Sequence, residues 1–181
     1  MTLEILIILV SLVFSAFFSG MEIAYVSSNK IHIELEKKQK GFLAKVLSKL
    51  TSKPSKFIAT MLIGNNIALV IYGFFMGDLL IHWFHSFLPT NSVVVDYLIE
   101  DLSLLTQTII STIIILTTAE FLPKVFFQIY SNSLLKFFAL PAYLFYLLFS
   151  VISDFVIWIS DMLLNAFFKT KGDEVQLAFT K

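Results

Sequence analysis

The stretch STIIILTTAEFLPKVFF, residues 111–127, places one carboxylate, Glu120, near the end of an apolar run and three residues before Pro123. A charged side chain inside a bilayer costs at least ~2.5 kcal/mol on insertion scales, so it indicates a function. A proline has no backbone N–H and clashes with the carbonyl four residues earlier, here that of Ala119. The stretch therefore predicts a membrane helix that is broken near Pro123, with freed carbonyl groups beside Glu120.

The composition is that of a membrane protein. Of the 181 residues, 57% are hydrophobic and 20 are Phe, and the mean hydropathy is +0.85. These values are too high for a soluble domain of this size. The 13 basic residues are all Lys and are balanced by 13 acidic ones, so net charge points to no partner, and we expect no nucleic acid. The absence of Cys excludes disulfides, thiolate metal ligands and cysteine nucleophiles.

Three apolar runs, residues 3–26, 57–87 and 102–127, are each long enough to cross the hydrocarbon. A fourth run, residues 134–168, differs because it carries a polar stripe. Four of its polar residues follow one another at helical spacings and so share one face: Ser150, Asp154, Asp161 and Asn165. We expect this run to lie along the membrane surface. The alternative is a fourth crossing whose polar stripe faces the other helices.

The lysines indicate the orientation. Residues 28–56 contain eight lysines and residues 78–103 contain none, so the first loop is expected to be cytoplasmic and the N-terminus outside. Three crossings then place the C-terminus in the cytoplasm. Residues 31–50 are expected to form two cytoplasmic helices that are broken near Gly41. Their inward-facing residues would be Ile33, Phe42, Val46 and Leu47. The expected fold class is thus an all-α membrane protein with three transmembrane helices, a cytoplasmic helix pair and an amphipathic juxtamembrane helix.

Polar oxygen groups occur in all three spans. Ser15 and Ser19 lie on one face of the first span, and Gly20 after them tolerates an unwound backbone. Asn65 and Asn66 in the second span point in different directions around a helix, so at least one of them needs a buried partner. The structural alternatives are serines bonded to their own helix and asparagines that join helices.

Together with Glu120, these groups form a set of hard oxygen donors. Such donors suit Mg²⁺, Ca²⁺ or an alkali ion better than zinc, copper or iron. A single carboxylate leaves a divalent ion with net positive charge, which favours the weak binding and release of a conduction pathway. The alternative for Glu120 is an interfacial carboxylate satisfied by Lys124, four residues later.

Gly73 and Gly77 form a small-xxx-small pair in the second span. Such a pair lets another helix approach closely, although glycine is also simply tolerated in membrane helices.

Three motifs resemble the transmembrane domain of the CNNM/CorC family of magnesium transport proteins. They are SAFFSGMEIAYVS (residues 15–27), IGNNIALV (residues 63–70) and AEFLPK (residues 119–124), in the family's order on three successive spans. The resemblance covers essentially the whole chain. The sequence departs from the family at Ala119, where glycine is common, and at Met21, where a small polar residue is common.

The resemblance implies a homodimer with three transmembrane helices and a belt-like juxtamembrane helix per protomer. It implies Mg²⁺ binding in an inward-open cavity, with Na⁺ proposed as the exchanged ion. Carried over to this chain, the implied ligands are Ser15, Ser19, Asn65 or Asn66, and Glu120, with help from a backbone carbonyl near Gly20.

By the same resemblance, residues 1–168 are the transmembrane domain and residues 169–181 begin a cytoplasmic linker. A pair of CBS domains and a small C-terminal domain would follow in a longer protein, which would lie in the cytoplasmic (inner) membrane. An alternative function is a non-transporting scaffold or sensor of the same family, for example one linked to gliding motility. An enzyme is not expected, because the spans contain neither a Ser/His arrangement nor a zinc motif.

Overall fold

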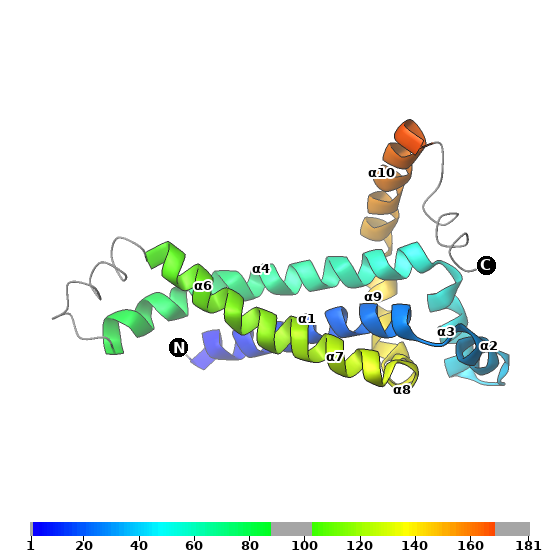
Figure 1. Cartoon of the computed structure of the whole chain (residues 1–181), viewed down its shortest axis with the longest axis horizontal. Coiled ribbons are helices and arrows are strands. Elements are labelled where there is room, and N and C mark those ends of the chain that lie inside the picture. The colour runs from blue at the N-terminus through cyan, green and yellow to red at the C-terminus, as the bar shows by residue number, and fades with distance from the viewer. Residues whose placement is uncertain (1, 88–102, 169–181) are drawn as a thin grey trace. The chain divides into compact units, whose positions relative to one another are not determined.

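The computed structural model of the chain describes residues 2–87 and 103–168 (Figure 1). These residues form helices and no strands, so the all-α expectation is confirmed for the described part of the chain. The helices are α1 (Thr2–Ser27), α2 (Lys30–Lys38), α3 (Phe42–Ser52), α4 (Pro54–Phe87), α6 (Ser103–Ile115), the π-helix η2 (Leu116–Phe121), α7 (Leu122–Ile129), α8 (Ser131–Phe137), α9 (Ala139–Leu148) and α10 (Ser150–Phe168).

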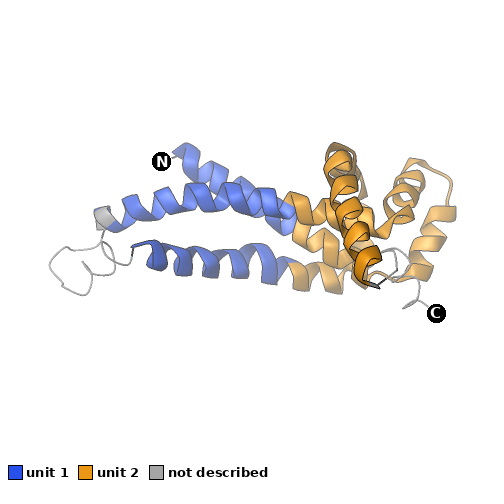
Figure 2. Cartoon of the chain, turned by 90° about the horizontal axis from the view of Figure 1, so that it is seen from above, with its two compact units in different colours: residues 1–17, 65–123 blue, residues 18–64, 124–181 orange. Residues whose placement is uncertain are grey.

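The helices form two compact units, which are coloured separately in Figure 2. Unit 1 contains residues 1–17 and 65–123, and unit 2 contains residues 18–64 and 124–181. The boundaries fall within α1, α4 and α7, so each of these helices contributes to both units.

The core of unit 1 is apolar and joins three helices. Its buried members come from α1 and α4: Ile8, Tyr72, Met76, Leu80 and Phe84. Partly buried isoleucines of α6 and its last turn pack against them: Ile110, Ile114 and Ile115. The Tyr72 hydroxyl also donates a hydrogen bond to the carbonyl oxygen of Ser111 over 3.3 Å. Unit 1 therefore packs α1, α4 and α6 against one another.

In unit 2, α2 and α3 form a helical hairpin. The Asn29 side chain caps α2 by accepting a hydrogen bond from the Ile31 N–H over 2.9 Å. The hairpin turns at Gly41, whose φ of 156° suits glycine and strains other residues. The predicted pair of helices broken near Gly41 is confirmed.

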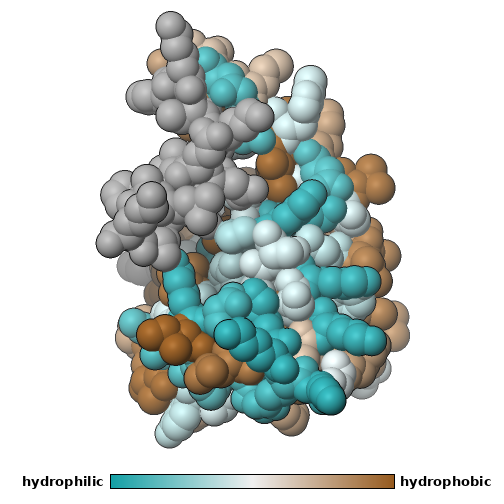
Figure 3. All heavy atoms as spheres, turned by 90° about the vertical axis from the view of Figure 1, so that its right-hand side faces the viewer, coloured by the Kyte–Doolittle hydropathy of each residue, from teal (hydrophilic) through white to brown (hydrophobic). Residues whose placement is uncertain are grey.

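Three of the four residues expected to face inward in the hairpin do so: Ile33, Val46 and Leu47 are buried. The prediction for Phe42 was wrong, because 69% of its surface is exposed. It is the first residue of α3, next to the turn, and the hairpin offers it no cover. Figure 3 looks onto this end of unit 2, where hydrophilic residues gather beside a smaller hydrophobic group.

Within residues 2–87 and 103–168, four helical segments are long and apolar enough to cross a membrane: Thr2–Ser27, Pro54–Phe84, Ser103–Ile129 and Ser150–Phe167. The first three coincide with the predicted spans. The fourth predicted run is divided into separate helices, since α8 and α9 meet at a bend of 62° and α10 follows them. Length and composition therefore allow α10 to cross, where the sequence predicted a surface helix.

Within unit 2, hydrogen bonds join the first turn of α10 to α4. The Lys56 ammonium donates hydrogen bonds to Asp154 Oδ2 over 2.6 Å and to Ser150 Oγ over 2.7 Å. One turn along α4, the hydroxyls of Thr60 and Ser153 are 2.9 Å apart. Two residues of the predicted polar stripe, Ser150 and Asp154, thus bind another helix.

Candidate functional site

Ser15 and Asn65 meet inside unit 1. Ser15 lies on α1 with no exposed surface, and Asn65 lies on α4 with 8% exposed. The Ser15 hydroxyl donates to Asn65 Oδ1 over 2.6 Å. The pair therefore places two side-chain oxygens together between membrane helices, and each oxygen keeps a lone pair that could bind a cation.

Asn66, the neighbour of Asn65, is exposed in this structure. A step of one residue turns the side chain by about 100° around a helix, so adjacent asparagines cannot both face α1. The sequence left open which of the two amides finds a buried partner, and the structure shows that Asn65 does.

Glu120 belongs to the same unit and lies on η2, half-buried, directly after the fully buried Ala119. In η2 the turns are wider than in an α-helix, and the N–H of Leu122 bonds to the carbonyl of Thr117, five residues earlier. Single π-helical turns inside α-helices are rare and often occur at functional sites. The carboxylate thus sits on an irregular stretch of backbone.

The structure corrects the helix break expected at Pro123. The helix runs on from α6 through η2 into α7, and Pro123 is the second residue of α7. The missing N–H of Pro123 therefore falls inside a continuous helix, directly after the wider turns of η2. The disturbance expected around Glu120 is present, but as widened turns ahead of the proline and not as a break.

Ser19 and Gly20 lie in unit 2. Ser19 is 1% exposed, and its hydroxyl oxygen has no hydrogen-bond partner within the described part of the chain. Gly20 packs against the ring of Phe127, since a Cβ on Gly20 would lie 2.5 Å from a ring carbon. An unpaired buried hydroxyl is costly and points to a ligand or water.

Gly64 has the same role as Gly20, which the sequence did not reveal. A Cβ on Gly64 would lie 2.5 Å from the ring of Phe18. Nothing among the described residues lies within 4 Å of a Cβ placed on Gly73. The close approach of another helix expected there stays a prediction. Gly77 makes one ordinary contact, at 3.6 Å to Gln107 Oε1.

The structure also reveals a polar residue that sequence reasoning missed. Gln107 on α6 is 7% exposed, and its Nε2 has no hydrogen-bond partner among the described residues. A signal was available, since Gln107 is the one carboxamide in the helix sequence SLLTQTIISTIII.

No group of three or more His, Asp or Glu side chains that could hold a metal occurs in residues 2–87 and 103–168. A cation held within unit 1 by Ser15, Asn65 and Glu120 would therefore meet hydroxyl and amide oxygens and a single carboxylate. Such a donor set fits a hard cation that keeps part of its water.

Comparison with known proteins identifies the family. A search among curated proteins gives no match. Residues 5–178 match the family described as cyclin M transmembrane N-terminal domain, abbreviated CNNM. This match spans nearly the whole chain, and the chain belongs to the CNNM transmembrane-domain family.

Proposed function

We propose that this chain transports Mg²⁺ across the membrane, by efflux coupled to Na⁺ entry, along an oxygen-lined path that opens to the cytoplasm. The observation that carries the proposal is the buried Ser15–Asn65 pair, which lies in the same unit as Glu120. Membership of the CNNM family supports a role related to Mg²⁺ transport. Within unit 1 the proposed ligands are Ser15, Asn65 and Glu120. The resemblance to the family adds Ser19 and a backbone carbonyl near Gly20.

The chemistry of these groups suits release as well as binding. Mg²⁺ requires near-octahedral oxygen ligands at ~2.0–2.1 Å and gives up its water reluctantly. Neutral hydroxyl and amide oxygens can replace some of that water, and one carboxylate offsets half of the ion's charge. The unpaired hydroxyl of Ser19 supports this reading, because a bound cation or its water would satisfy it.

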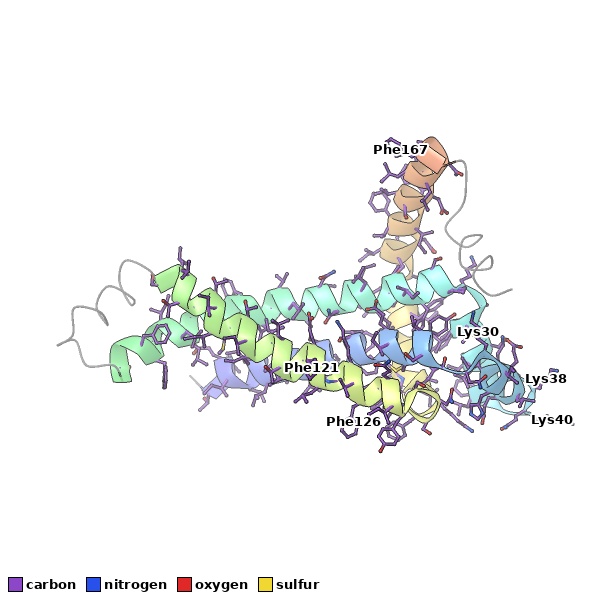
Figure 4. All side chains as sticks on the ribbon, viewed as in Figure 1. Lys30, Lys38, Lys40, Phe121, Phe126 and Phe167 are labelled. Carbon is purple, nitrogen blue, oxygen red and sulfur yellow. The ribbon has the colours of Figure 1, made fainter. Side chains whose placement is uncertain are left out.

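The proposal includes an orientation and an assembly. We place the hairpin of α2 and α3 in the cytoplasm, α10 along the membrane surface and the N-terminus outside, in a homodimer within the cytoplasmic membrane. The seven lysines of residues 30–53 support this side of the membrane. Figure 4 shows Lys38 and Lys40 at the tip of the hairpin. A Lys38→Cys variant, in a chain without other cysteines, should react only with reagents that reach the cytoplasm.

The transport proposal is tested with Glu120→Gln, which keeps the size of the side chain and removes its charge. Purified protein is heated with and without Mg²⁺, and the same variants are reconstituted in liposomes with a Mg²⁺-sensitive dye. We expect Glu120→Gln and Ser19→Ala to remain folded and to lose both the Mg²⁺-dependent rise in melting temperature and the flux.

Thr118→Val serves as the matched control, because the exposed Thr118 hydroxyl bonds to its own helix through the Ile114 carbonyl at 2.6 Å. This variant should keep both properties. Full Mg²⁺ protection and flux in Glu120→Gln would reject the cation site. Mg²⁺ protection without flux in the unaltered protein would instead favour a sensor.

A further inference from the structure

Gln107 lies on the inward face of α6. The large apolar side chains of this helix that are exposed include Leu105, Ile109 and Ile113. Ile110 and Ile114, three and seven residues after Gln107, pack against the core of unit 1. Gln107 shares their face, since residues separated by three and seven positions lie on one side of a helix. An amide therefore points toward the core, between the apolar side chains of α4 and α6.

Gly77 on α4 provides the space for this amide. A Cβ on Gly77 would lie 3.6 Å from Gln107 Oε1, an ordinary van der Waals distance, so the amide oxygen lies next to this glycine. The neighbours of Gly77 in the core, Met76 and Leu80, are buried and apolar. They offer the amide no hydrogen bond.

The oxygen and the nitrogen of the Gln107 amide have different surroundings. Oε1 faces Gly77, whereas Nε2 is buried without a hydrogen-bond partner in the described part of the chain. Native proteins rarely leave such a donor unpaired, because burial without a partner costs its full desolvation energy. A buried water molecule can accept the hydrogen bond of such an isolated donor.

We infer that the Gln107 amide is hydrated and forms the outer end of the proposed ion path within unit 1. Gln107 precedes Glu120 by 13 residues along α6 and η2, which corresponds to about 20 Å of helix. It lies one turn after the start of α6, which the proposed orientation places near the outer membrane face. The inference rests on the proposed transport function: a hydrated Mg²⁺ leaving the Glu120 region would donate hydrogen bonds from its waters to Oε1.

The first test measures hydration directly and does not depend on transport. Because the chain contains no cysteine, Gln107→Cys is a single-cysteine variant. In liposomes it is exposed to a membrane-impermeant, positively charged methanethiosulfonate, and modification is followed by mass spectrometry. The controls are Leu105→Cys and Ile109→Cys, which bracket Gln107 in depth and lie on the exposed face.

We expect Gln107→Cys to react at least ~10 times faster than either control, because thiolates form in water and not in lipid. Mg²⁺ should slow this reaction. A rate equal to that of the controls would overturn the inference, whatever the flux assay shows.

The second test uses Gln107→Leu, which replaces the amide by an apolar side chain of similar size. This variant should not melt at a higher temperature than the unaltered protein, because the amide that it removes is already hydrogen-bonded to water. Its Mg²⁺ protection should persist, because Glu120 is unchanged, while flux should fall at least ~5-fold. Unchanged flux would overturn the role of Gln107 in the path and leave the Glu120 site standing.

Discussion

The Ser15 hydroxyl donates a hydrogen bond to Asn65 Oδ1 over 2.6 Å, with both side chains buried between α1 and α4. This contact distinguishes two neighbouring amides that are chemically identical. Asn65 is held in place on one face of α4, whereas Asn66 is exposed. A ligand for an ion benefits from such a fixed orientation, because less side-chain entropy is lost when the ion binds.

Asn65→Ala should therefore be more damaging than Asn66→Ala. Removing Asn65 leaves the buried Ser15 hydroxyl without its acceptor, which costs about 1–3 kcal/mol of unfolding free energy. Asn66→Ala changes an exposed position and should stay within about 0.5 kcal/mol. Thermal unfolding of the purified protein in detergent measures both. An equal or larger loss for Asn66→Ala would show that a second polypeptide covers Asn66.

The glycines differ in how closely other side chains pack against them. Gly64→Ala would push a methyl group into the Phe18 ring, which is itself held edge-on against Phe145 at 4.8 Å. Overpacking of this kind costs about 1–3 kcal/mol and exceeds the gain of about 0.5–1 kcal/mol from the better helix propensity of alanine. Gly20→Ala should behave in the same way, because its Phe127 neighbour stacks on Phe138 at 5.6 Å.

Gly73→Ala is the matched control, since nothing among the described residues lies within 4 Å of its added methyl group. It should leave the melting temperature unchanged or raise it slightly. A loss at Gly73 equal to that at Gly64 would indicate a contact made by another molecule, as the small-xxx-small pattern with Gly77 first suggested.

The parts of the fold that depend on local sequence could be predicted. The three apolar runs coincide with helices long enough to cross a membrane, and the hairpin turns at Gly41 as expected. The disturbance around Glu120 could also be predicted, because Pro123 acts on the carbonyl four residues before it. The form of that disturbance could not, since the choice between a break and a wider turn depends on how the whole helix packs.

Contacts between segments that are far apart along the chain could not be predicted from the sequence. Helical periodicity cannot decide whether Asn65 or Asn66 faces Ser15, because that depends on the rotation of α4. It also could not show that Phe42 lies outside the hairpin core, or that Gly64 and not Gly73 meets an aromatic ring. For the same reason the polar stripe of α10 gave no hint that Lys56 would bind its first turn.

The contact between Lys56 and Asp154 should respond asymmetrically to mutation. The Lys56 side chain is 10% exposed and that of Asp154 is 57% exposed. After Lys56→Met, water can still satisfy the carboxylate, so the cost should be about 0–1 kcal/mol. After Asp154→Ala, a mostly buried ammonium loses its counter-charge, and a charged hydrogen bond of about 1.5–3 kcal/mol is lost.

Melting temperatures in detergent provide the measurement, and the double variant provides the control. If the buried charge causes the loss, Lys56→Met should rescue Asp154→Ala to the level of Lys56→Met alone. A double variant that is as unstable as the sum of the two single variants would contradict this account.

The hairpin of α2 and α3 should bind anionic lipid. Lys38, Lys40 and Lys45 are exposed on it, whereas Lys37 pairs with Glu34. Large apolar side chains are exposed on the same hairpin: Ile31 (73%), Leu35 (59%) and Phe42 (69%). Lysines beside exposed apolar groups are typical of a surface that rests on lipid headgroups.

Replacing Lys38, Lys40 and Lys45 together by Gln should weaken binding of phosphatidylglycerol about 100-fold, since each lysine near an anionic surface contributes ~1 kcal/mol. The measurement is the rise in melting temperature when phosphatidylglycerol replaces phosphatidylcholine. The Arg triple variant is the matched control, because it keeps the charge and should keep the rise. About 0.5 M salt should remove most of the rise from the unaltered protein, because it shortens the range of the attraction to a few ångströms. If the Gln variant keeps the full rise, the exposed apolar side chains bind the lipid without help from the lysines.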